Sequence, residues 1–446
     1  MEASSRTQDA SNHRKLTQPH WIASCMFSKS LPKIWTSDAS PFRIRPRGRD
    51  LIERRSRGSS EDPRSSMLQQ TRDCRDKNDL LQLQRHRVRP LGRGMESVKE
   101  ARESALTQSP VNLKKTLFTL VASIVCRLAF GINIHKCEFV DEEKVADLVH
   151  KFEMLGAGIA FTDFFPGVGW LIDQISGQKK TLNNVFSDLD TFYENVLDDH
   201  LKPGRRVSES PDVVDVMVDL MKKQEKDGDS FKLTTDHLKG IISDIFLAGV
   251  NTSVVTLIWA MTELIRNPKV MKKVQDEIRT ILGDKKQRIT EQDLNQLHYF
   301  KLVVKETFRL HPAVPLLLQR ETLSHVKIQG YDIPAKTQMM INIYSIARDP
   351  KLWENPDEFN PDRFLDSSID YRGLNFELLP FGSGRRICPG ITMGITTVEL
   401  GLFNLLYFFD WEVPQGKNVK DIDLEETGSF IINKKTTLQL VPILHR

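Results

Sequence analysis

The chain has 446 residues, of which 39% are hydrophobic and 8% aromatic, enough for a sizeable core in one large domain or two to three ordinary ones. Its five cysteines form no Cys-x-x-Cys pair, which argues against a zinc ribbon or a disulfide framework and fits a reducing compartment. The formal charge of +4 is uneven: residues 1–95 carry 20 Lys and Arg against 10 Asp and Glu, whereas residues 96–446 carry 43 against 49.

Residues 1–95 form a basic segment with fourteen arginines between Arg43 and Arg93 and no persistent helical or alternating apolar period. The segment has no 18-residue apolar run to span a bilayer and no apolar core of a secretory signal. A nucleic-acid-binding arm would need aromatic stacking residues beside the arginines, and a transit peptide should be poor in acids. We therefore predict a disordered or non-native segment, such as the product of a wrongly spliced first exon, with no nucleic-acid partner.

Organised sequence begins near Glu96 and reads as helix after helix, with no internal repeat. The apolar stretch Leu113–Phe130 is flanked by charge and too short for a membrane anchor, so we expect a buried core helix. Residues 140–154 and 182–201 have the spacing of amphipathic helices, and residues 164–167 between them indicate an apolar break. Polar loops are expected at residues 203–211 and 225–230.

The longest helix comes next. We expect Thr235 to cap its start and Asn267-Pro268 to end it, which leaves 32 residues, or about 48 Å of helix. A further helix should start at Asn267-Pro268 and close at Gly283.

Another helix is expected from Thr290 to His311, followed by short strands at residues 326–328 and 331–333. The fold class predicted is mainly α with a minor β part.

The most informative stretch is Phe-Gly-Ser-Gly-Arg-Arg-Ile-Cys-Pro-Gly, from Phe381 to Gly390, just before an apolar helical stretch. Gly382 and Gly384 allow backbone angles and close approaches that a Cβ would forbid, so the turn can hold Cys388 rigidly. We expect Pro389 at the first position of the following helix, Phe381 covering the sulfur, and the helix N-terminus with Arg385 and Arg386 favouring the ionised sulfur.

Two other interpretations of this loop are a buried structural cysteine and a dinucleotide-binding turn at residues 382–384. Two observations argue against the dinucleotide-binding turn. Ile387 occupies the position of the third glycine of such a turn, and no βαβ pattern surrounds it in the sequence.

The ten residues resemble the haem-binding loop of the cytochrome P-450 (haem-thiolate monooxygenase) family. The resemblance implies a P-450-like helical fold with haem b (iron protoporphyrin IX) as cofactor and the Cys388 thiolate as axial iron ligand, which pushes electron density toward O–O cleavage. It also places Phe381, Gly382, Gly384 and Gly390 in the cofactor-binding loop.

A second motif, Ala248-Gly249-Val250-Asn251-Thr252, lies in the middle of the long helix, where a glycine costs about 1 kcal/mol against alanine. By resemblance, Ala248 and Gly249 leave room for dioxygen over the haem, and Thr252 bonds the oxygen and relays protons. A threonine inside a helix otherwise bonds its own i−4 carbonyl. Asn251 departs from the family, which commonly has an acid there, so proton relay is slower or uses another water chain.

The third motif is Glu306-Thr-Phe-Arg309, whose spacing puts a carboxylate and a guanidinium on one helix face. By resemblance the pair is buried and Arg363, in Phe359-Asn-Pro-Asp-Arg-Phe364, completes a structural triad that supports the cysteine loop. Alone, such a pair is an ordinary surface ion pair.

Arg386 and Arg320 match the family positions that bind the haem propionates, for which guanidinium groups are suited. Without the resemblance they are two ordinary surface arginines. Substrate-facing positions, also by resemblance, include Ala248 and the small or apolar residues of two later segments, residues 313–317 and 429–431; we select Ala313, Val314, Leu316, Leu317 and Phe430.

The resemblance covers residues 96–446, read as an incomplete haem-thiolate monooxygenase domain, and is nearest the plant microsomal A-type branch, in its family numbered seventy-one. Residues 1–95 contain no counterpart of the membrane anchor, the proline-rich hinge or the early helices. Relatives sit at the cytosolic face of the endoplasmic reticulum membrane, but without an anchor we expect weak or no membrane association, or a cytosolic chain.

The function implied is oxidation of a small lipophilic molecule of plant secondary metabolism by O2, with electrons from NADPH through a flavoprotein reductase. Two alternatives stay open. One is a truncated or mis-spliced, non-catalytic product unable to bind haem, and the other is isomerase or dehydratase chemistry at the same iron.

Overall fold

The computed structural model describes residues 99–134, 142–157, 161, 165, 168–205, 211–227, 233–283 and 291–445. All of them fall in the compact unit Ser40–Arg446. The predicted basic segment of residues 1–95, most of the apolar break at residues 164–167 and parts of both polar loops lie outside the described residues.

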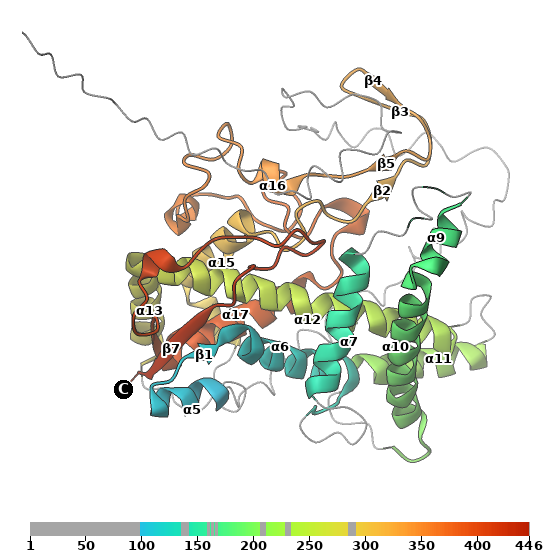
Figure 1. Ribbon diagram of the computed structural model, residues 1–446, viewed down its shortest axis with the longest axis horizontal. Helices are drawn as coiled ribbons and strands as arrows, with labels where there is room; N and C mark the ends of the chain where they lie inside the picture. The colour runs from blue at the N-terminus through green and yellow to red at the C-terminus, as the bar shows by residue number, and fades with distance from the viewer. Residues whose placement is uncertain are drawn as a thin grey trace, which may run out of the picture. The chain divides into compact units, whose positions relative to one another are not determined.

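Helices dominate the described part of the chain, as predicted (Figure 1). In chain order they are α5 Lys99–Thr107, α6 Leu113–Phe130, α7 Glu142–Ala157, α9 Gly169–Ile175, α10 Gln178–Leu201, α11 Val213–Asp227, α12 Thr235–Arg266, α13 Pro268–Leu282, α14 Glu291–Asn295, α15 His298–Leu310, α16 Ile343–Ile346 and α17 Ile391–Phe408. Three short 3-10 helices join them: η3 Pro361–Phe364, η4 Gly384–Arg386 and η5 Val419–Asp421.

The β part is small and antiparallel. Its strands are β1 Val111–Asn112, β2 Arg320–Glu321, β3 Val326–Ile328, β4 Tyr331–Ile333, β5 Gln338–Met339, β6 Phe409–Glu412 and β7 Gln439–Leu444. They form a three-stranded sheet in the order β1-β7-β6 and two hairpin-like pairs, β2-β5 and β3-β4. In the first sheet Val111 pairs with Leu440, so β1 and β7 join distant parts of the sequence. The two predicted strands, β3 and β4, are confirmed.

Helix α12 is the centre of the core and runs between α6, α10, α15 and α17 (Figure 1). Every residue from 253 to 265 is buried, and most of them are apolar, as expected for a helix that is surrounded by other parts of the core. The cap is Thr234, whose hydroxyl accepts from the His237 amide, so the prediction that Thr235 caps the helix is wrong by one residue. The predicted length of 32 residues is confirmed.

The single helix expected from Thr290 to His311 is wrong, since α14 ends at Asn295 and α15 begins at His298. The break has a tertiary cause. The Glu277 carboxylate of α13 accepts from the Tyr299 amide at 2.7 Å and the Phe300 amide at 2.8 Å. A carboxylate supplied from another helix thus satisfies the free N–H groups at the start of α15.

Two of the described helices, α12 and α17, are long and apolar enough to cross a membrane. In each, however, more than half of the apolar window is buried against other parts of the protein: 61% in α12 and 56% in α17. Core packing accounts for both.

Candidate active site

Cys388 lies in a tight loop that turns the chain into α17. Gly382 and Gly384 have φ of 70° and 71°, the left-handed region that the sequence predicted for glycine there. The Cys388 amide donates to the Phe381 carbonyl at 2.9 Å, which closes the loop. Helix α17 begins at Ile391 with Gly390 as its cap, so the prediction that Pro389 occupies its first position is wrong. A further turn, from Cys388 to Ile391, stands between the cysteine and the helix.

The thiol of Cys388 is half-buried, and burial raises its pKa, while the Gly390 amide acts in the opposite direction. Arg385 and Arg386 are exposed. The Gly390 amide, at the cap of α17, thus favours the ionised sulfur, but burial outweighs it in the protein alone. The contribution of Arg385 and Arg386 stays a prediction. A metal ion removes the proton of a thiol that coordinates it.

The ring of Phe381 connects this loop to α15. It packs edge-on against Phe308 of α15 at 5.1 Å between ring centroids and against Tyr371 at 6.0 Å. Burial raises the pKa of Tyr371, so its phenol stays neutral and the aromatic cluster is uncharged at neutral pH. Coverage of the sulfur by Phe381 stays a prediction.

In α12, Ala248 is exposed, Gly249 and Thr252 are half-buried, and Asn251 is buried. The Thr252 hydroxyl donates to the Ala248 carbonyl at 2.6 Å. This is the i−4 bond that a threonine inside a helix commonly makes, and it is the alternative to a role with dioxygen. The Asn251 amide nitrogen is buried without a partner among the described residues. A Cβ on Gly249 would lie 2.9 Å from Met393 Cε, so this glycine lets α12 approach the first turn of α17. Its role with dioxygen stays a prediction.

The predicted contacts of Glu306 with two arginines are present, and Arg363 is half-buried. Arg309 Nε donates to Glu306 Oε2 at 2.7 Å and Arg309 Nη2 to Oε1 at 2.8 Å, while Arg363 Nε donates to Oε1 at 3.0 Å. Both Glu306 and Arg309 have no exposed surface. The Asn360 amide, which sequence reasoning missed, also donates to Oε1 at 2.8 Å.

The remaining guanidinium donors of this triad reach backbone carbonyls of residues 347–358. Arg309 Nη1 donates to the carbonyls of Ala347 and Pro356 at 2.6 and 2.7 Å, and Arg363 Nη1 donates to that of Glu354 at 2.8 Å. Because charge-assisted bonds to a buried carboxylate are strong, the triad fixes this loop onto α15.

Arg320 and Arg386 lie together beside the cysteine loop, where Arg320 Nη2 donates to the Arg386 carbonyl at 3.2 Å. Within the described ranges neither guanidinium has a carboxylate partner. Two such cations beside a half-buried thiol are the donors that a metal-bearing ring with two carboxylates requires, so the residues present fit a haem.

The first predicted substrate-facing segment contacts the residue that directly follows the second one, since the Ile432 amide donates to the Ala313 carbonyl at 3.0 Å. Leu317 has φ of 52°, and its Cδ1 lies 3.7 Å from where a Cβ on Gly382 would be, so the segment after α15 touches the cysteine loop. Ala313, Val314 and Leu316 are half-buried and Phe430 is 45% exposed.

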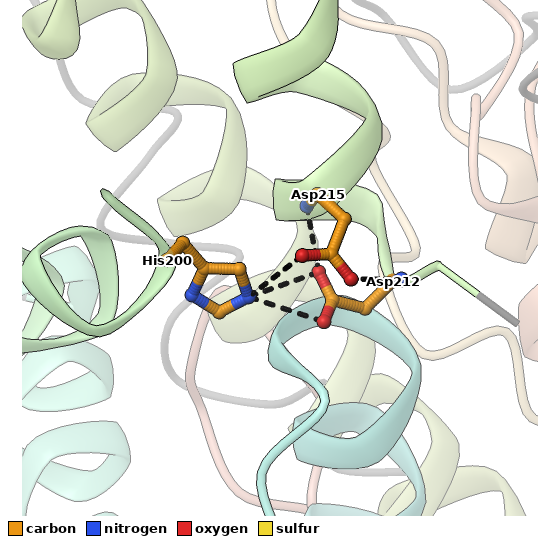
Figure 2. A group of neighbouring side chains, drawn as sticks. All are labelled: His200, Asp212 and Asp215. Atoms are coloured by element: carbon orange, nitrogen blue, oxygen red, sulfur yellow. Dashed lines mark hydrogen bonds and ion pairs between the residues drawn. The ribbon is translucent and has the colours of Figure 1, made fainter. Parts of the chain in front are cut away.

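Sequence reasoning missed a second polar cluster, at the junction of α10 and α11. Figure 2 shows His200 pointing at Asp212 and Asp215 at the start of α11. His200 Nδ1 faces the Val196 carbonyl at 2.7 Å, and its Nε2 lies 3.1 Å from both Asp212 oxygens. Arg205 reaches Asp212 at 3.4 Å and Asp215 at 3.3 Å.

This cluster forms the cap of α11. The Asp215 amide donates to Asp212 at 2.8 Å, and the Asp212 amide to Asp215 at 3.0 Å. Burial acts to raise the pKa of Asp212, but the hydrogen bonds led by His200 lower it overall, whereas burial raises the pKa of Asp215. The Asp-x-x-Asp spacing was the available sequence signal.

A mainly helical fold, with a cysteine on a glycine-bent loop between a long central helix and a buried Glu/Arg/Arg triad, defines the class of haem-thiolate oxygenases. The comparisons agree. The Cytochrome P450 family profile matches residues 92–440. The chain is 86% identical to Cytochrome P450 71B7 of Arabidopsis thaliana over 348 residues, which is 78% of this chain and 69% of the relative.

It is 71% identical to Cytochrome P450 71B23 of Arabidopsis thaliana, over 77% of this chain and 68% of that protein. It is also 63% identical to the bifunctional dihydrocamalexate synthase/camalexin synthase of Arabidopsis thaliana, over 73% of this chain and 66% of that enzyme. The chain belongs to the cytochrome P450 family, within plant family 71, and is a haem-dependent monooxygenase.

Proposed function

We propose that this chain uses O2 and electrons from NADPH, delivered by a flavoprotein reductase, to insert one oxygen atom into a small lipophilic molecule of plant secondary metabolism. The observation that carries this proposal is the Cys388 loop, with its two left-handed glycines and the hydrogen bond from Cys388 to Phe381. A loop closed in this way holds the Cys388 sulfur in a fixed position just before the start of α17.

Haem, when bound, supplies the iron at which O2 is reduced and one oxygen atom passes to the substrate. Cys388 Sγ would be its ligand, with Gly382, Gly384 and Gly390 shaping the loop. Arg320 and Arg386 would hold its two carboxylates, and Glu306, Arg309 and Arg363 would keep the neighbouring loop in place. Arg309, Arg320 and Arg363 are each positioned by hydrogen bonds that they donate to backbone carbonyls, and the carbonyl of Arg386 accepts the bond from Arg320.

Thr252 would hold and pass a proton at Oγ1, which requires its hydroxyl to turn away from the Ala248 carbonyl that it now bonds. Asn251 would orient water through its amide, because the nitrogen has no partner among the described residues. An amide donates a hydrogen bond but does not give up a proton at neutral pH.

The substrate is proposed to be lipophilic because the segments assigned to it, Ala313–Leu317 and the turn containing Phe430, are apolar or small. A relative 63% identical to this chain is named for camalexin synthesis, which supports a small organic substrate from secondary metabolism. By resemblance the enzyme is proposed to work at the cytosolic face of the endoplasmic reticulum membrane, with weak membrane association or a cytosolic location as the alternative.

The test is the absorption spectrum of the reduced, carbon-monoxide-bound protein, together with the haem content per chain. Wild-type protein should bind about one haem and give the red-shifted Soret band of a thiolate ligand. Cys388→Ser should lose that band. Cys126→Ser is the matched control, because Cys126 is a buried cysteine of α6 that forms no disulfide and lies outside the loop. Wild-type protein without haem, or an unchanged band in Cys388→Ser, would refute the proposal.

A further inference from the structure

A buried ring stack joins the long central helix to the chain that leaves α15. The indole of Trp259, in α12, and the imidazole of His311, directly after α15, are parallel within 3° and 4.2 Å apart between centroids. Their exposed fractions are 1% and 6%. None of the roles described above uses either side chain.

The imidazole is fixed in its plane by a carboxylate on the same helix as the indole. His311 Nε2 lies 2.8 Å from Glu263 Oε1, and Glu263 Oε2 accepts from Asn267 Nδ2 at 3.3 Å. Glu263 is 3% exposed. Because a carboxylate oxygen only accepts, the His311 proton lies on Nε2, and the ring cannot rotate without losing this bond.

The indole N–H holds a second segment. Trp259 Nε1 donates to the Ile432 carbonyl at 3.1 Å, and the Ile432 amide donates to the Ala313 carbonyl at 3.0 Å. Both backbone groups of Ile432 are therefore occupied, one by α12 and the other by the segment after His311. Trp259 thus contacts His311 through its ring and the C-terminal turn through its nitrogen.

The segment that begins at His311 makes a further backbone hydrogen bond four residues later, at Pro315. The Pro315 carbonyl accepts from the Ile343 amide at 3.0 Å. Leu317 then adopts φ of 52°, a left-handed conformation that a leucine keeps only when its surroundings impose it, and touches the cysteine loop at Gly382. The segment therefore spans from the ring stack to the predicted cofactor loop.

We infer that Trp259 and His311 are positioning residues that set the separation of the two substrate-facing segments, and thereby the size of the molecule admitted beside the iron. The inference rests on the proposed function for those two segments. Trp259 contacts His311 with its ring and Ile432 with its N–H, and Ile432 in turn bonds Ala313. Removal of the N–H should therefore loosen the turn at Ile432 and, through the bond to Ala313, the segment after His311.

The test compares Trp259→Phe with Trp411→Phe. Trp411 is a matched control because its Nε1 also donates to a backbone carbonyl, that of Leu405, at 2.9 Å, away from the two segments. The probes are imidazole and 4-phenylimidazole, which bind ferric haem through nitrogen and shift its Soret band. We expect Trp259→Phe to change the ratio of their dissociation constants by roughly threefold to tenfold, the effect of losing one hydrogen bond, and Trp411→Phe to leave it unchanged.

Amide hydrogen exchange gives a second readout that needs no haem. In Trp259→Phe the amides of residues 313–317 and 430–433 should exchange faster than in wild type, and those of α15 at the wild-type rate. Unchanged exchange in both segments would overturn the inference, as would faster exchange with an unchanged ratio in the haem-containing protein. A wild-type chain that binds no haem would instead overturn the proposed function.

Discussion

Glu306 and Arg309 form a two-pronged ion pair in a fully buried place, with N–O distances of 2.7 and 2.8 Å. They are three residues apart on α15, so the helix itself sets their spacing. Helix geometry alone therefore brings the two side chains together. The loop of residues 347–363 is in turn held by hydrogen bonds from Arg309 to its backbone carbonyls.

Glu306→Ala should leave the buried Arg309 guanidinium, and the half-buried one of Arg363, without their carboxylate, which costs about 3–5 kcal/mol when one member of a buried pair is removed. We expect a protein that takes up little or no haem, measured as haem per chain together with the urea midpoint of unfolding. Lys272→Ala, which removes a surface pair with Asp276 at 3.0 Å, serves as the control and should change neither. Full haem content in Glu306→Ala would contradict the role given to the triad.

Gly131→Ala should destabilise the protein through the cap of α11. Gly131 has φ of 64°, and an added Cβ would overlap the Asp212 carboxylate that contacts His200. Gly204→Ala isolates the backbone cost, since Gly204 has φ of 78° but no atom within 4 Å of an added Cβ. We expect about 1–2 kcal/mol from the left-handed backbone in both variants, and a further loss of about 1–3 kcal/mol only in Gly131→Ala, where Asp212 must give up hydrogen bonds. Equal losses would show that the overlap is relieved without cost.

Stability should depend on His311 in mildly acidic solution. Burial lowers the pKa of His311 below its ordinary value of 6.5, with Glu263 opposing this and Arg348 and Arg309 reinforcing it. The unfolded chain therefore binds the proton more readily, so the contribution of this group is full above about pH 6.5 and is lost as the pH falls.

The measurement is the free energy of unfolding of wild type and His311→Gln, from about pH 8 to about pH 5.5. The advantage of wild type should shrink toward the acid end, because glutamine does not titrate. His325→Gln, at a position where the wild-type imidazole is 63% exposed, is measured alongside for comparison with a surface histidine. A constant difference for His311→Gln would mean that its pKa is not lowered.

Asn251→Asp should raise the share of NADPH electrons that reach product rather than hydrogen peroxide. The change replaces a buried amide, whose nitrogen has no partner among the described residues, by a group able to deliver a proton beside Thr252. Peroxide formed per NADPH consumed is the measurement, with Asn251→Leu as a control that removes the amide and adds no acid. Equal or greater peroxide yield in Asn251→Asp would count against a relay limited by the amide.

Much of the helical framework could be predicted because its signals are local. The bounds of α6 agree at both ends, where Asn112 accepts from the Lys115 amide and Gly131 closes the helix. The contacts of Glu306 with Arg309 follow from helix spacing, and that with Arg363 from the resemblance to a known family.

What the sequence did not predict depends on contacts between distant residues. Glu277 of α13 separates α14 from α15, although the residues at the break carry no strong stop signal. The stack of Trp259 on His311 joins a residue of α12 to the residue directly after α15. The pKa of Cys388 follows burial more than the charges of its sequence neighbours, and burial is a property of the whole fold.

The pairing of β1 with β7 has a consequence for biosynthesis. Val111 and its partner Leu440 are separated by more than three hundred residues, a distance that a ribosome covers in about 20–60 s. The sheet therefore closes only after β7 has been synthesised, and until then the edge of β1 is unpaired, although α6 and α12 can already associate. Chaperone binding to nascent chains should be strongest during that interval, and deletion of the last strand should prolong it.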